Sequence, residues 1–401
     1  MMLDAYLYDG LRSPFGRHAG ALSSVRPDDL VAEVMTALLA RSPWEPAQLD
    51  DVILGNTNQA GEDSRNVGRN AVLAAGFPTS VPGQTVNRLC ASGLAAVIDA
   101  ARAITCHEGD LYLAGGVESM SRAPFVMAKA DKAYSRDIQV FDTTIGARFP
   151  NPRVLEAHGA DTMPETADNV ARDLGIGRQA ADTFAAASQA RFARAQAEGF
   201  FQGEIHPIRV STGRKTPPRV VDTDEHPRAD VTLESLSQLR PLFEGGVVTA
   251  GNASGINDGA AALLIGSARV GEQAGVRPLV RLVAAAASGV DPRVMGLGPV
   301  GAITLALARA GRSLSDMDVI EINEAFACQV LGCLQQLGLA FDDPRVNPNG
   351  GAIAVGHPLG ASGARLALTV ARELQRREGR YAVVSLCIGM GQGLALVMER
   401  V

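Results

Sequence analysis

The sequence predicts an α/β protein built in five layers, in which two sheets alternate with three layers of helices. Two observations support this class. Short apolar runs that suit buried strands alternate along the chain with longer amphipathic or apolar stretches that suit helices. The pattern of the first third also recurs in the last third, so two similar units follow one another. Because each unit must cover both faces of its sheet, we expect the units to share a middle layer of helices.

Three segments carry the internal repeat, and each recurs about 270 residues later in the same order. PAQLDDVILGN (46–56) matches SLSDMDVIEIN (313–323), ASGLAA (91–96) matches ASGARL (361–366), and LYLAGGVESMS (111–121) matches YAVVSLCIGMG (381–391). We therefore predict two duplicated halves, at 1–120 plus 245–269 and at 270–401, with an inserted loop domain at 121–244. Insertions over a rigid core commonly bind substrates.

Local patterns predict the individual elements. Residues 26–41 open with Pro27, Asp28 and Asp29 and continue with apolar residues at helical spacing, which predicts an amphipathic helix. Residues 91–106 are small and apolar on all sides, as in a fully buried helix. Further helices are expected at 164–174 and 179–198, and strands at 52–54, 81–87, 319–322, 382–386 and within 247–267. Strands that alternate with helices predict a mainly parallel sheet.

Composition and charge exclude several classes of protein. The chain has 401 residues, of which 46% are hydrophobic, so its core needs no metal or disulfide staple. A net charge of −6 gives no overall attraction to nucleic acid or to an anionic membrane. No segment suits a bilayer span and the first residues lack a signal-peptide pattern, so we expect a cytoplasmic protein. Five Cys without a CxxC pair indicate reduced thiols and no metal site.

Two segments bear on ligands that contain phosphate. The densest basic stretch comprises Arg209, Arg214, Lys215, Arg219 and Arg228, and it suits either a solvated loop or a site for a phosphorylated small molecule. GMGQG (389–393) lacks the GxGxxG form, and the chain ends too soon to supply the acidic residue that follows a dinucleotide loop. We therefore do not expect dinucleotide binding.

Four side chains are expected to meet where strands end and helices begin. Cys90 follows a strand and directly precedes the buried helix, a position where free N–H groups lower the pKa of a thiol. His357 lies in a glycine-rich loop before a helix, and Asn323 and Cys387 lie at strand ends. In doubly wound folds such strand ends form the active site. The remaining thiols lie in apolar helical stretches and are predicted to be inert: Cys106, Cys328 and Cys333.

Six motifs, in order and spread over nearly the whole chain, resemble the thiolases, which are acyl-CoA C-acyltransferases. They are NRLCASGLAA (87–96), GGVESMSRAP (115–124), TAGNASGINDGAAA (249–262), NEAFA (323–327), GGAIAVGHPLGASGARL (350–366) and CIGMGQG (387–393). Four further segments resemble the β-ketoadipyl-CoA (3-oxoadipyl-CoA) thiolases of aromatic catabolism more closely: GEDSRNVGRN (61–70), RAPFVMAKA (122–130), DTTIGARFPNP (142–152) and MPETADNVA (163–171).

The resemblance implies a thiolase-like fold and a specific reaction. Coenzyme A would cleave 3-oxoadipyl-CoA to succinyl-CoA and acetyl-CoA through an acyl-cysteine intermediate, as in the β-ketoadipate pathway. Coenzyme A and acyl-CoA would be the small-molecule partners, with no permanently bound cofactor and no metal. The resemblance also implies a homodimer or a homotetramer built as a dimer of dimers.

The resemblance further implies the roles of the catalytic residues. Cys90 would be the nucleophile that accepts the acyl group, and His357 would raise its thiolate fraction and donate to a thioester oxyanion. Cys387 would exchange a proton with the α-carbon of acetyl-CoA. Asn323 would hold a water in the first oxyanion hole, and the backbone N–H groups of Cys90 and Gly389 would form the second.

Binding residues carry over in the same way. Arg228, Ser235, Phe243 and Ser254 match coenzyme A contacts of the family, and Met163 and Met295 would line the acyl pocket beside Phe326. General thiolases place a His before the position of Met163, whereas this chain has Thr162, which points to a different substrate tail. A tail that ends in a carboxylate needs a cation. Arg65 is the preferred candidate, since the family's dimer brings its loop to the partner subunit's active site; Arg69 and Arg148 are weaker candidates.

Three alternatives accompany this interpretation. A general acetyl-CoA C-acetyltransferase or 3-ketoacyl-CoA thiolase, acting on acetoacetyl-CoA or fatty 3-oxoacyl-CoA, would use the same chemistry. A decarboxylating ketoacyl synthase would carry a second His where Asn323 stands. A non-catalytic acyl-CoA-binding protein would not need both Cys90 and Cys387.

Overall fold

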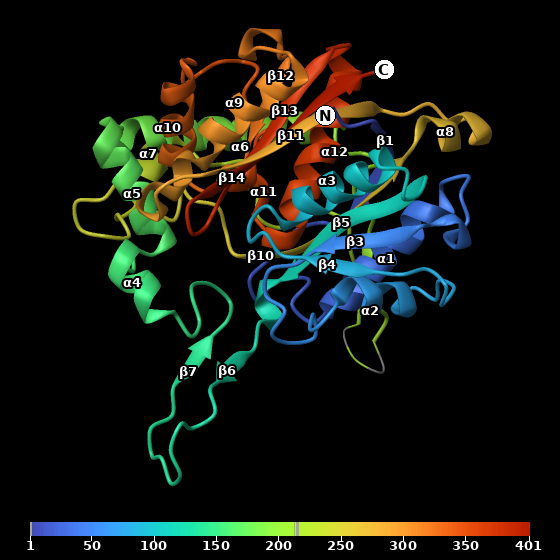
Figure 1. Cartoon of the computed structure of the whole chain (residues 1–401). Helices are drawn as coiled ribbons and strands as arrows, with labels where there is room; N and C mark the ends of the chain where they lie inside the picture. The colour runs from blue at the N-terminus through green and yellow to red at the C-terminus, as the bar shows by residue number, and fades with distance from the viewer. Residues whose placement is uncertain (1, 212, 214–215) are drawn as a thin grey trace.

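The computed structural model describes residues 2–211, 213 and 216–401 as a mixed α/β fold around one large sheet (Figure 1). Over the described residues the strand order is β4-β3-β5-β10-β1-β11-β14-β13-β12, with β2 beside β10. These strands are β1 (Ala5–Arg12), β2 (Gly16–Arg17), β3 (Asp51–Gly55), β4 (Gln84–Val86), β5 (Leu111–Ser119), β10 (Asn257–Gly266), β11 (Val280–Gly289), β12 (Val319–Ile322), β13 (Tyr381–Ile388) and β14 (Gln392–Arg400).

The two halves of the sheet repeat one arrangement, which confirms the duplication predicted from the sequence. In the first half β3 runs parallel to β5, and β5 runs antiparallel to β10. In the second half β12 runs parallel to β13, and β13 runs antiparallel to β14. The edge strand β4 also has a counterpart, because Val346 forms a parallel bridge with Ile320 of β12.

The prediction of a mainly parallel sheet was wrong. The parallel pairs are β3–β4, β3–β5 and β12–β13, and the other neighbours pair antiparallel. β13 and β14 are joined by a tight turn at Gly389–Gly391, and a turn this short allows only an antiparallel pair. The two halves also join edge to edge, since Ala5 and Leu7 of β1 pair with Leu282 and Val280 of β11.

Helices fill three layers around the two halves of the sheet. α3 (Ser92–Thr105) and α12 (Leu359–Arg377) lie side by side in the middle and contact strands of both halves (Figure 1). α1 (Pro27–Ala40) and α2 (Val67–Ala74) cover the outer face of the first half. α9 (Gly298–Ala310) covers the second half, and α10 (Ala327–Leu337) packs beside α9, while α8 (Ala268–Ala274) and α11 (Ala352–Val355) are short connections.

Side-chain alternation along the strands separates the core into three clusters, as five layers require. Leu263 of β10 faces the central cluster with α3 and α12, whereas its neighbour Leu264 faces α1. On β13, Val384 faces the centre and Val383 faces the outer cluster with α9 and α10. The two middle helices approach so closely that a Cβ on Gly93 would lie 2.4 Å from the carbonyl oxygen of Gly360. Only glycine therefore fits at this contact.

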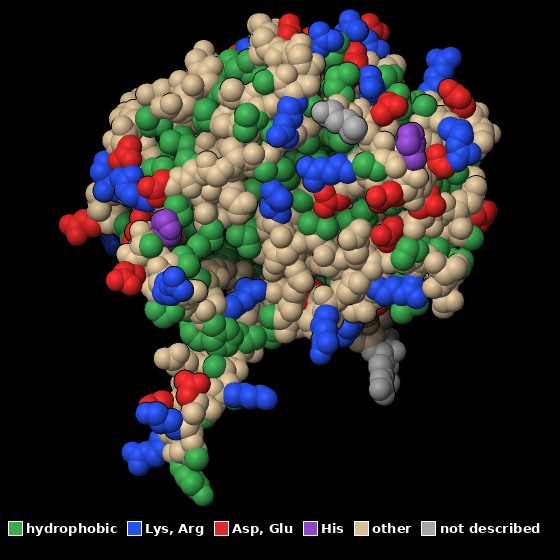
Figure 2. Space-filling model, in the orientation of Figure 1, with side chains coloured by type: hydrophobic (Ala, Val, Ile, Leu, Met, Phe, Trp, Pro, Cys, Tyr) green, Lys and Arg blue, Asp and Glu red, His purple; other side chains and the backbone are tan. Residues whose placement is uncertain are grey.

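The segment between β5 and β10 carries elements with no counterpart in the second half. A hairpin of β6 (Phe125–Met127) and β7 (Val140–Asp142) projects from the body (Figure 1). Hydrophobic and charged side chains both line this arm (Figure 2), and its exposed apolar residues include Phe125, Met127 and Tyr134. The segment continues through α4 (Pro152–His158), α5 (Met163–Leu174), α6 (Arg178–Ala197), β8 (Ile208–Val210), β9 (Arg219–Val221) and α7 (Leu233–Ser237).

The predicted helices at 26–41, 91–106, 164–174 and 179–198 correspond to α1, α3, α5 and α6. The predicted strands correspond to β3, β4, β12, β13 and β10. In the described part of the chain, no helix combines the length and the apolar character that a membrane span requires.

Candidate functional site

Cys90 lies on the loop between β4 and α3, directly before the residue that caps the helix. Two hydrogen bonds through Ser92 hold this loop: Ser92 Oγ donates to the carbonyl oxygen of Leu89 (2.6 Å) and accepts the N–H of Arg88 (2.9 Å). Leu89 adopts a φ of 48°, a conformation that costs energy for a branched side chain. The backbone N–H groups of Gly389 and of Cys90 itself donate toward the Cys90 sulfur. The loop therefore presents the thiol to two fixed donors.

The expected lowering of the Cys90 pKa was wrong. Burial disfavours the thiolate and raises the pKa, and the two N–H groups only partly offset this effect. The negative charge of Glu118 raises the pKa further. The resting residue is therefore a thiol, and its proton must leave to a base during reaction.

His357 lies shortly before α12, and its hydrogen bonds determine which ring nitrogen can accept a proton. Its Nδ1 lies 2.6 Å from Ser362 Oγ, and that hydroxyl donates its own proton to the carbonyl oxygen of Pro358 (2.8 Å). Ser362 can therefore only accept from the ring, which places the imidazole proton on Nδ1 and leaves a lone pair on Nε2. Burial, and then the charge of Arg365, lower the pKa of His357 to about 3, so the ring is neutral.

Asn323 lies at the end of β12 and is brought beside His357. Its Nδ2 lies 3.3 Å from His357 Nε2, and its backbone N–H donates to the carbonyl oxygen of Ser385 (2.9 Å). The side chain is buried, and its Oδ1 has no hydrogen-bond partner among the described residues. A buried amide oxygen without a partner suits a bound water or ligand group.

Cys387 lies near the end of β13 and is fully buried. Burial, followed by the charges of Cys90 and Cys333, raises its pKa well above the ordinary value. A thiol held in its protonated form beside Cys90 is suited to donate a proton.

The residues expected in the acyl pocket lie around this centre. A Cβ on Gly389 would lie 3.5 Å from both Leu89 Cδ1 and Met163 Sδ, so Met163 of α5 reaches the catalytic turn. Met295 and Phe326 are buried in the same apolar cluster as Cys387. Met295 and Phe326 therefore belong to the apolar core that contains Cys387, and their role in an acyl pocket stays a prediction.

The positions expected to bind coenzyme A lie in the segment after β9 and before β10. Arg228 is exposed, and its backbone N–H donates to Gln189 Oε1 (2.9 Å). Ser235 lies in the first turn of α7, where its Oγ donates to the carbonyl oxygen of the N-cap residue Thr232 (2.8 Å). Ser254 donates its N–H to the carbonyl oxygen of Ala325, next to Phe326 (2.9 Å). Ser254 thus lies next to Phe326, whereas Arg228 and Ser235 are exposed.

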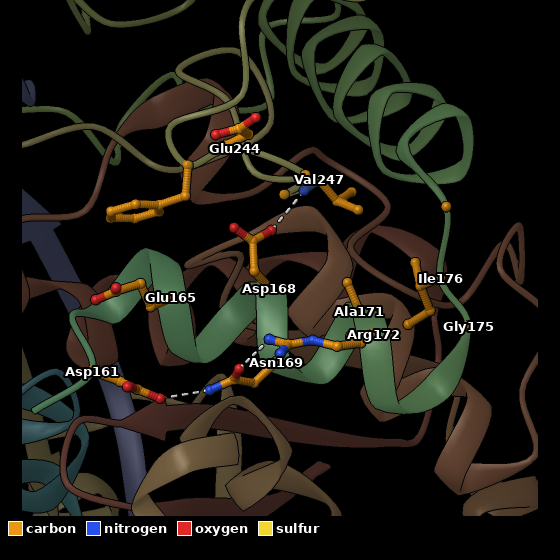
Figure 3. A pocket seen from close by; sticks show the side chains of 14 residues that line it. Asp161, Glu165, Asp168, Asn169, Ala171, Arg172, Gly175, Ile176, Glu244 and Val247 are labelled. Carbon is orange, nitrogen blue, oxygen red and sulfur yellow. Dashed lines mark hydrogen bonds between the residues drawn. The ribbon is translucent and has the colours of Figure 1, made fainter. Parts of the chain in front are cut away.

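A separate pocket of about 590 Å³ lies between α5 and the loop at 243–247 (Figure 3). Asp168 points from α5 toward this loop, and its Oδ1 accepts the N–H groups of Val247 (2.7 Å) and Val248 (3.0 Å). Of the candidate residues, Phe243 lines this pocket, together with the carboxylates of Asp161, Glu165, Asp168 and Glu244. Four carboxylates against one cation, Arg172, give the lining a negative balance, so the pocket does not suit the phosphates of an acyl-CoA.

The remaining candidates divide by exposure and position. Arg65 is exposed on the loop before α2, and its predicted role stays a prediction. Of the basic stretch, Arg214 and Lys215 lie outside the described residues, while Arg209 and Arg219 lie on the β8–β9 hairpin. Within the described residues, no three His, Cys, Asp or Glu side chains come together as a metal site.

The prediction for the other thiols was partly wrong. Cys328 and Cys333 are buried in α10, and burial raises the pKa of each to about 12, which suits inert thiols. Cys106 is exposed, because α3 ends one residue before it and its side chain reaches solvent.

Sequence reasoning missed three polar residues that position the site. Glu118, at the end of β5, accepts the N–H groups of Thr57 (3.1 Å), Asn58 (3.0 Å) and Gly360 (2.8 Å), and thereby ties two loops to the start of α12. Ser362 sets the ring of His357, and Asn257 Oδ1 accepts the backbone N–H of His357 (2.9 Å). All three lie inside the motifs quoted in the sequence analysis. A polar residue surrounded by small apolar ones was the signal that could have identified each of them.

Comparisons with known proteins show what this chain is similar to over nearly its whole length. Residues 5–269 match the family model for the N-terminal domain of thiolase, and residues 276–400 match the C-terminal domain. The chain is 58% identical over 402 residues to the 3-oxoadipyl-CoA/3-oxo-5,6-dehydrosuberyl-CoA thiolase of Escherichia coli (strain K12), with 100% of both chains covered. It is 55% identical over 404 residues to the beta-ketoadipyl-CoA thiolase of Acinetobacter baylyi, again with 100% of both covered. The crystal structure of human mitochondrial 3-ketoacyl-CoA thiolase in complex with CoA aligns with a TM-score of 0.91 and 39% identity, covering 100% of this chain and 99% of that one.

Proposed function

Because the chain belongs to the thiolase family and is an enzyme of that type, we propose that it cleaves 3-oxoadipyl-CoA with coenzyme A to succinyl-CoA and acetyl-CoA. The full-length relatives at 58% and 55% identity carry the substrate assignment, since both are named for 3-oxoadipyl-CoA or its synonym. The general thiolase remains the alternative, because it would use the same catalytic residues on a smaller or longer acyl group.

The first half of the reaction begins at Cys90. His357 Nε2 accepts the thiol proton as the sulfur attacks C3 of the substrate, and the protonated ring then donates a hydrogen bond to the thioester oxygen while it keeps the proton. The N–H groups of Cys90 and Gly389 stabilise the negative charge on the oxygen of C3, and a water on Asn323 forms the other oxyanion hole, at the thioester oxygen of acetyl-CoA. The C2–C3 bond breaks, its electron pair forms the enolate of acetyl-CoA, and Cys387 protonates that carbon.

The second half transfers the acyl group to coenzyme A. The Cys387 thiolate left by the first half accepts the proton of the incoming coenzyme A thiol. That sulfur attacks the acyl-Cys90 thioester, and collapse of the tetrahedral intermediate releases succinyl-CoA and the Cys90 thiolate, which regains its proton from His357. The raised pKa values of both thiols support these roles, because each returns to the protonated form at the end of the cycle.

Coenzyme A itself is proposed to lie along the segment that contains Arg228, Ser235, Phe243 and Ser254, with no permanently bound cofactor. The exposed Arg228 suits a phosphate group, and Phe243 offers an apolar face to the pantetheine arm. Because free thiols must stay reduced for this chemistry, we place the enzyme in the cytoplasm.

We also propose a homodimer or a homotetramer. The projecting β6–β7 hairpin carries apolar side chains that stay exposed in the single chain, including Phe125, Met127 and Ile138. Such a patch favours contact with another subunit. Light scattering of the purified protein tests this part, and a monomer at micromolar concentration would contradict it.

Product analysis tests the proposed activity. The protein is incubated with 3-oxoadipyl-CoA and free coenzyme A, and the thioesters are separated by chromatography. We expect succinyl-CoA and acetyl-CoA in equal amounts, and a higher kcat/KM than for acetoacetyl-CoA. A clear preference for acetoacetyl-CoA would favour the general thiolase.

A further inference from the structure

Arg148 is a half-buried cation on the loop that follows β7, and backbone carbonyls hold it in place. Its Nη2 donates to the carbonyl oxygen of Asn58 (2.6 Å), and its Nη1 lies 3.4 Å from that of Thr143. Among the described residues, no carboxylate lies within ion-pair distance of it. Arg122, by contrast, already has a carboxylate partner, because it forms a bidentate ion pair with Glu62.

Hydrogen bonds connect Arg148 to the loop of the catalytic thiol. Asn58 Nδ2 donates to the carbonyl oxygen of Thr143 (2.9 Å), which fixes the loop of Arg148 against residues 57–58. Thr57, the residue before Asn58, donates from its Oγ1 to the carbonyl oxygen of Leu89 (3.1 Å). Leu89 is itself the residue before Cys90. Arg148 is thus linked through residues 57–58 to Leu89, the residue before Cys90.

The acyl group of the proposed substrate requires a cation at short range. Once the succinyl group is on Cys90, its carboxylate carbon lies three bonds beyond the thioester carbon, about 4 Å away when extended. A carboxylate in an apolar pocket needs a charged partner. A guanidinium has five N–H groups, so two bonds to carbonyls leave donors for a carboxylate.

We propose that Arg148 binds the distal carboxylate of the acyl group and so determines the preference for 3-oxoadipyl-CoA, an inference that rests on the proposed function. The backbone carbonyls of Asn58 and Thr143 orient the guanidinium, and no carboxylate of the described chain competes for its charge. This reverses the order of preference reached from sequence, where Arg65 stood before Arg148. Arg65 would act on the partner subunit's site, whereas Arg148 is held by two backbone carbonyls of its own chain and is linked to Leu89 through residues 57–58.

The test compares two substrates that differ only at the far end of the acyl chain. 3-Oxoadipyl-CoA ends in a carboxylate, and 3-oxohexanoyl-CoA has the same six carbons and ends in a methyl group. We expect Arg148→Gln to lower kcat/KM for 3-oxoadipyl-CoA by about tenfold to a hundredfold, and for 3-oxohexanoyl-CoA by less than about threefold. Arg148→Lys keeps the positive charge but loses the planar pair of N–H donors. Its kcat/KM for 3-oxoadipyl-CoA should lie between those of wild type and Arg148→Gln. Arg153→Gln, an exposed Arg in the same segment, is the matched control and should leave both values unchanged.

Several results would overturn the inference. Equal losses on both substrates would mean that Arg148 only supports the loop at Asn58. If Arg65→Ala lowers kcat/KM for 3-oxoadipyl-CoA alone and Arg148→Gln does not, the residue that binds the distal carboxylate is Arg65. If Arg148→Gln does not fold, Arg148→Lys and Arg148→Met replace it. If both variants keep the wild-type ratio of kcat/KM for 3-oxoadipyl-CoA to kcat/KM for 3-oxohexanoyl-CoA, the proposal is wrong. A wild-type enzyme that cleaves 3-oxohexanoyl-CoA but not 3-oxoadipyl-CoA would instead refute the proposed function itself.

Discussion

Replacing Ser362 by Ala should disable His357 while leaving substrate binding nearly intact. In wild type the Ser362 hydroxyl is the acceptor for Nδ1–H, at 2.6 Å. The carbonyl oxygen of Pro358 loses one donor in the variant but still accepts the N–H groups of Ala361 and of residue 362. The unpaired group is therefore the imidazole N–H, and a buried donor without a partner costs about 1–3 kcal/mol.

The ring cannot escape this cost by changing tautomer. Moving the proton to Nε2 would point it at the Asn323 amide, 3.3 Å away, and would remove the lone pair that accepts the Cys90 proton. The bond to Ser362 also strengthens when the ring becomes positively charged during reaction, so its loss weighs more on the transition state than on the resting enzyme. We expect kcat to fall by about tenfold to a hundredfold, with KM changed by less than about threefold.

Steady-state kinetics with acetoacetyl-CoA or 3-oxoadipyl-CoA, together with thermal unfolding, measure this effect. Thr369→Val is the matched control, since Thr369 is a second buried hydroxyl of α12 whose Oγ1 has no hydrogen-bond partner among the described residues. This control should keep wild-type kcat. A Ser362→Ala enzyme with wild-type kcat would refute the assignment of the Nδ1 proton and of His357 Nε2 as the base.

Three further predictions concern the other catalytic groups. Cys387→Ala should still form an acyl-enzyme from a simple acyl-CoA but lose carbon–carbon cleavage, since the enolate then lacks its acid; normal cleavage would remove Cys387 from the mechanism. Asn323→Ala should lower kcat by about 10²–10³, the usual scale for one oxyanion contact, and a change below threefold would make Asn323 structural. His357 has its pKa lowered from 6.5 to about 3 by burial and Arg365, so the unfolded chain binds more protons and this residue's contribution to stability is lost as pH falls from 6.5 toward 3. The melting temperature of His357→Gln should therefore fall less than that of wild type over this window, and parallel curves would contradict the neutral, buried ring.

Local patterns were enough to predict most elements and the proximity of two pairs of candidate residues, Asn323 with His357 and Cys90 with Cys387. Their catalytic roles stay predictions. Residues 319–322 form the strand expected from three β-branched apolar residues in four positions. The buried helix after Cys90 follows from small residues on every side. The repeat then placed Cys90 and His357 before equivalent helices, α3 and α12, whose first turns touch in the structure. Sequence patterns of this kind report short-range order and burial, and both were sufficient here.

Long-range pairing and electrostatics needed the structure. The union of the sheet halves through Ala5 and Leu282 joins residues far apart in the chain, and apolar periodicity does not specify a strand's partner. The raised pKa of Cys90 depends on burial and on Glu118, whose position in space the motif does not give. A helix start alone suggested a lowered pKa, because only the favourable N–H groups were visible from sequence.

Intact-protein and peptide mass spectrometry after mixing with 3-oxoadipyl-CoA, without free coenzyme A, tests the central claim most directly. In the absence of the second substrate the acyl-enzyme cannot be thiolysed, so it should accumulate. We predict a succinyl group on the peptide that contains Cys90, together with released acetyl-CoA, and no adduct in Cys90→Ala. An adduct on Cys387 or Cys106 in place of Cys90, or an acetyl group in place of succinyl, would contradict the account.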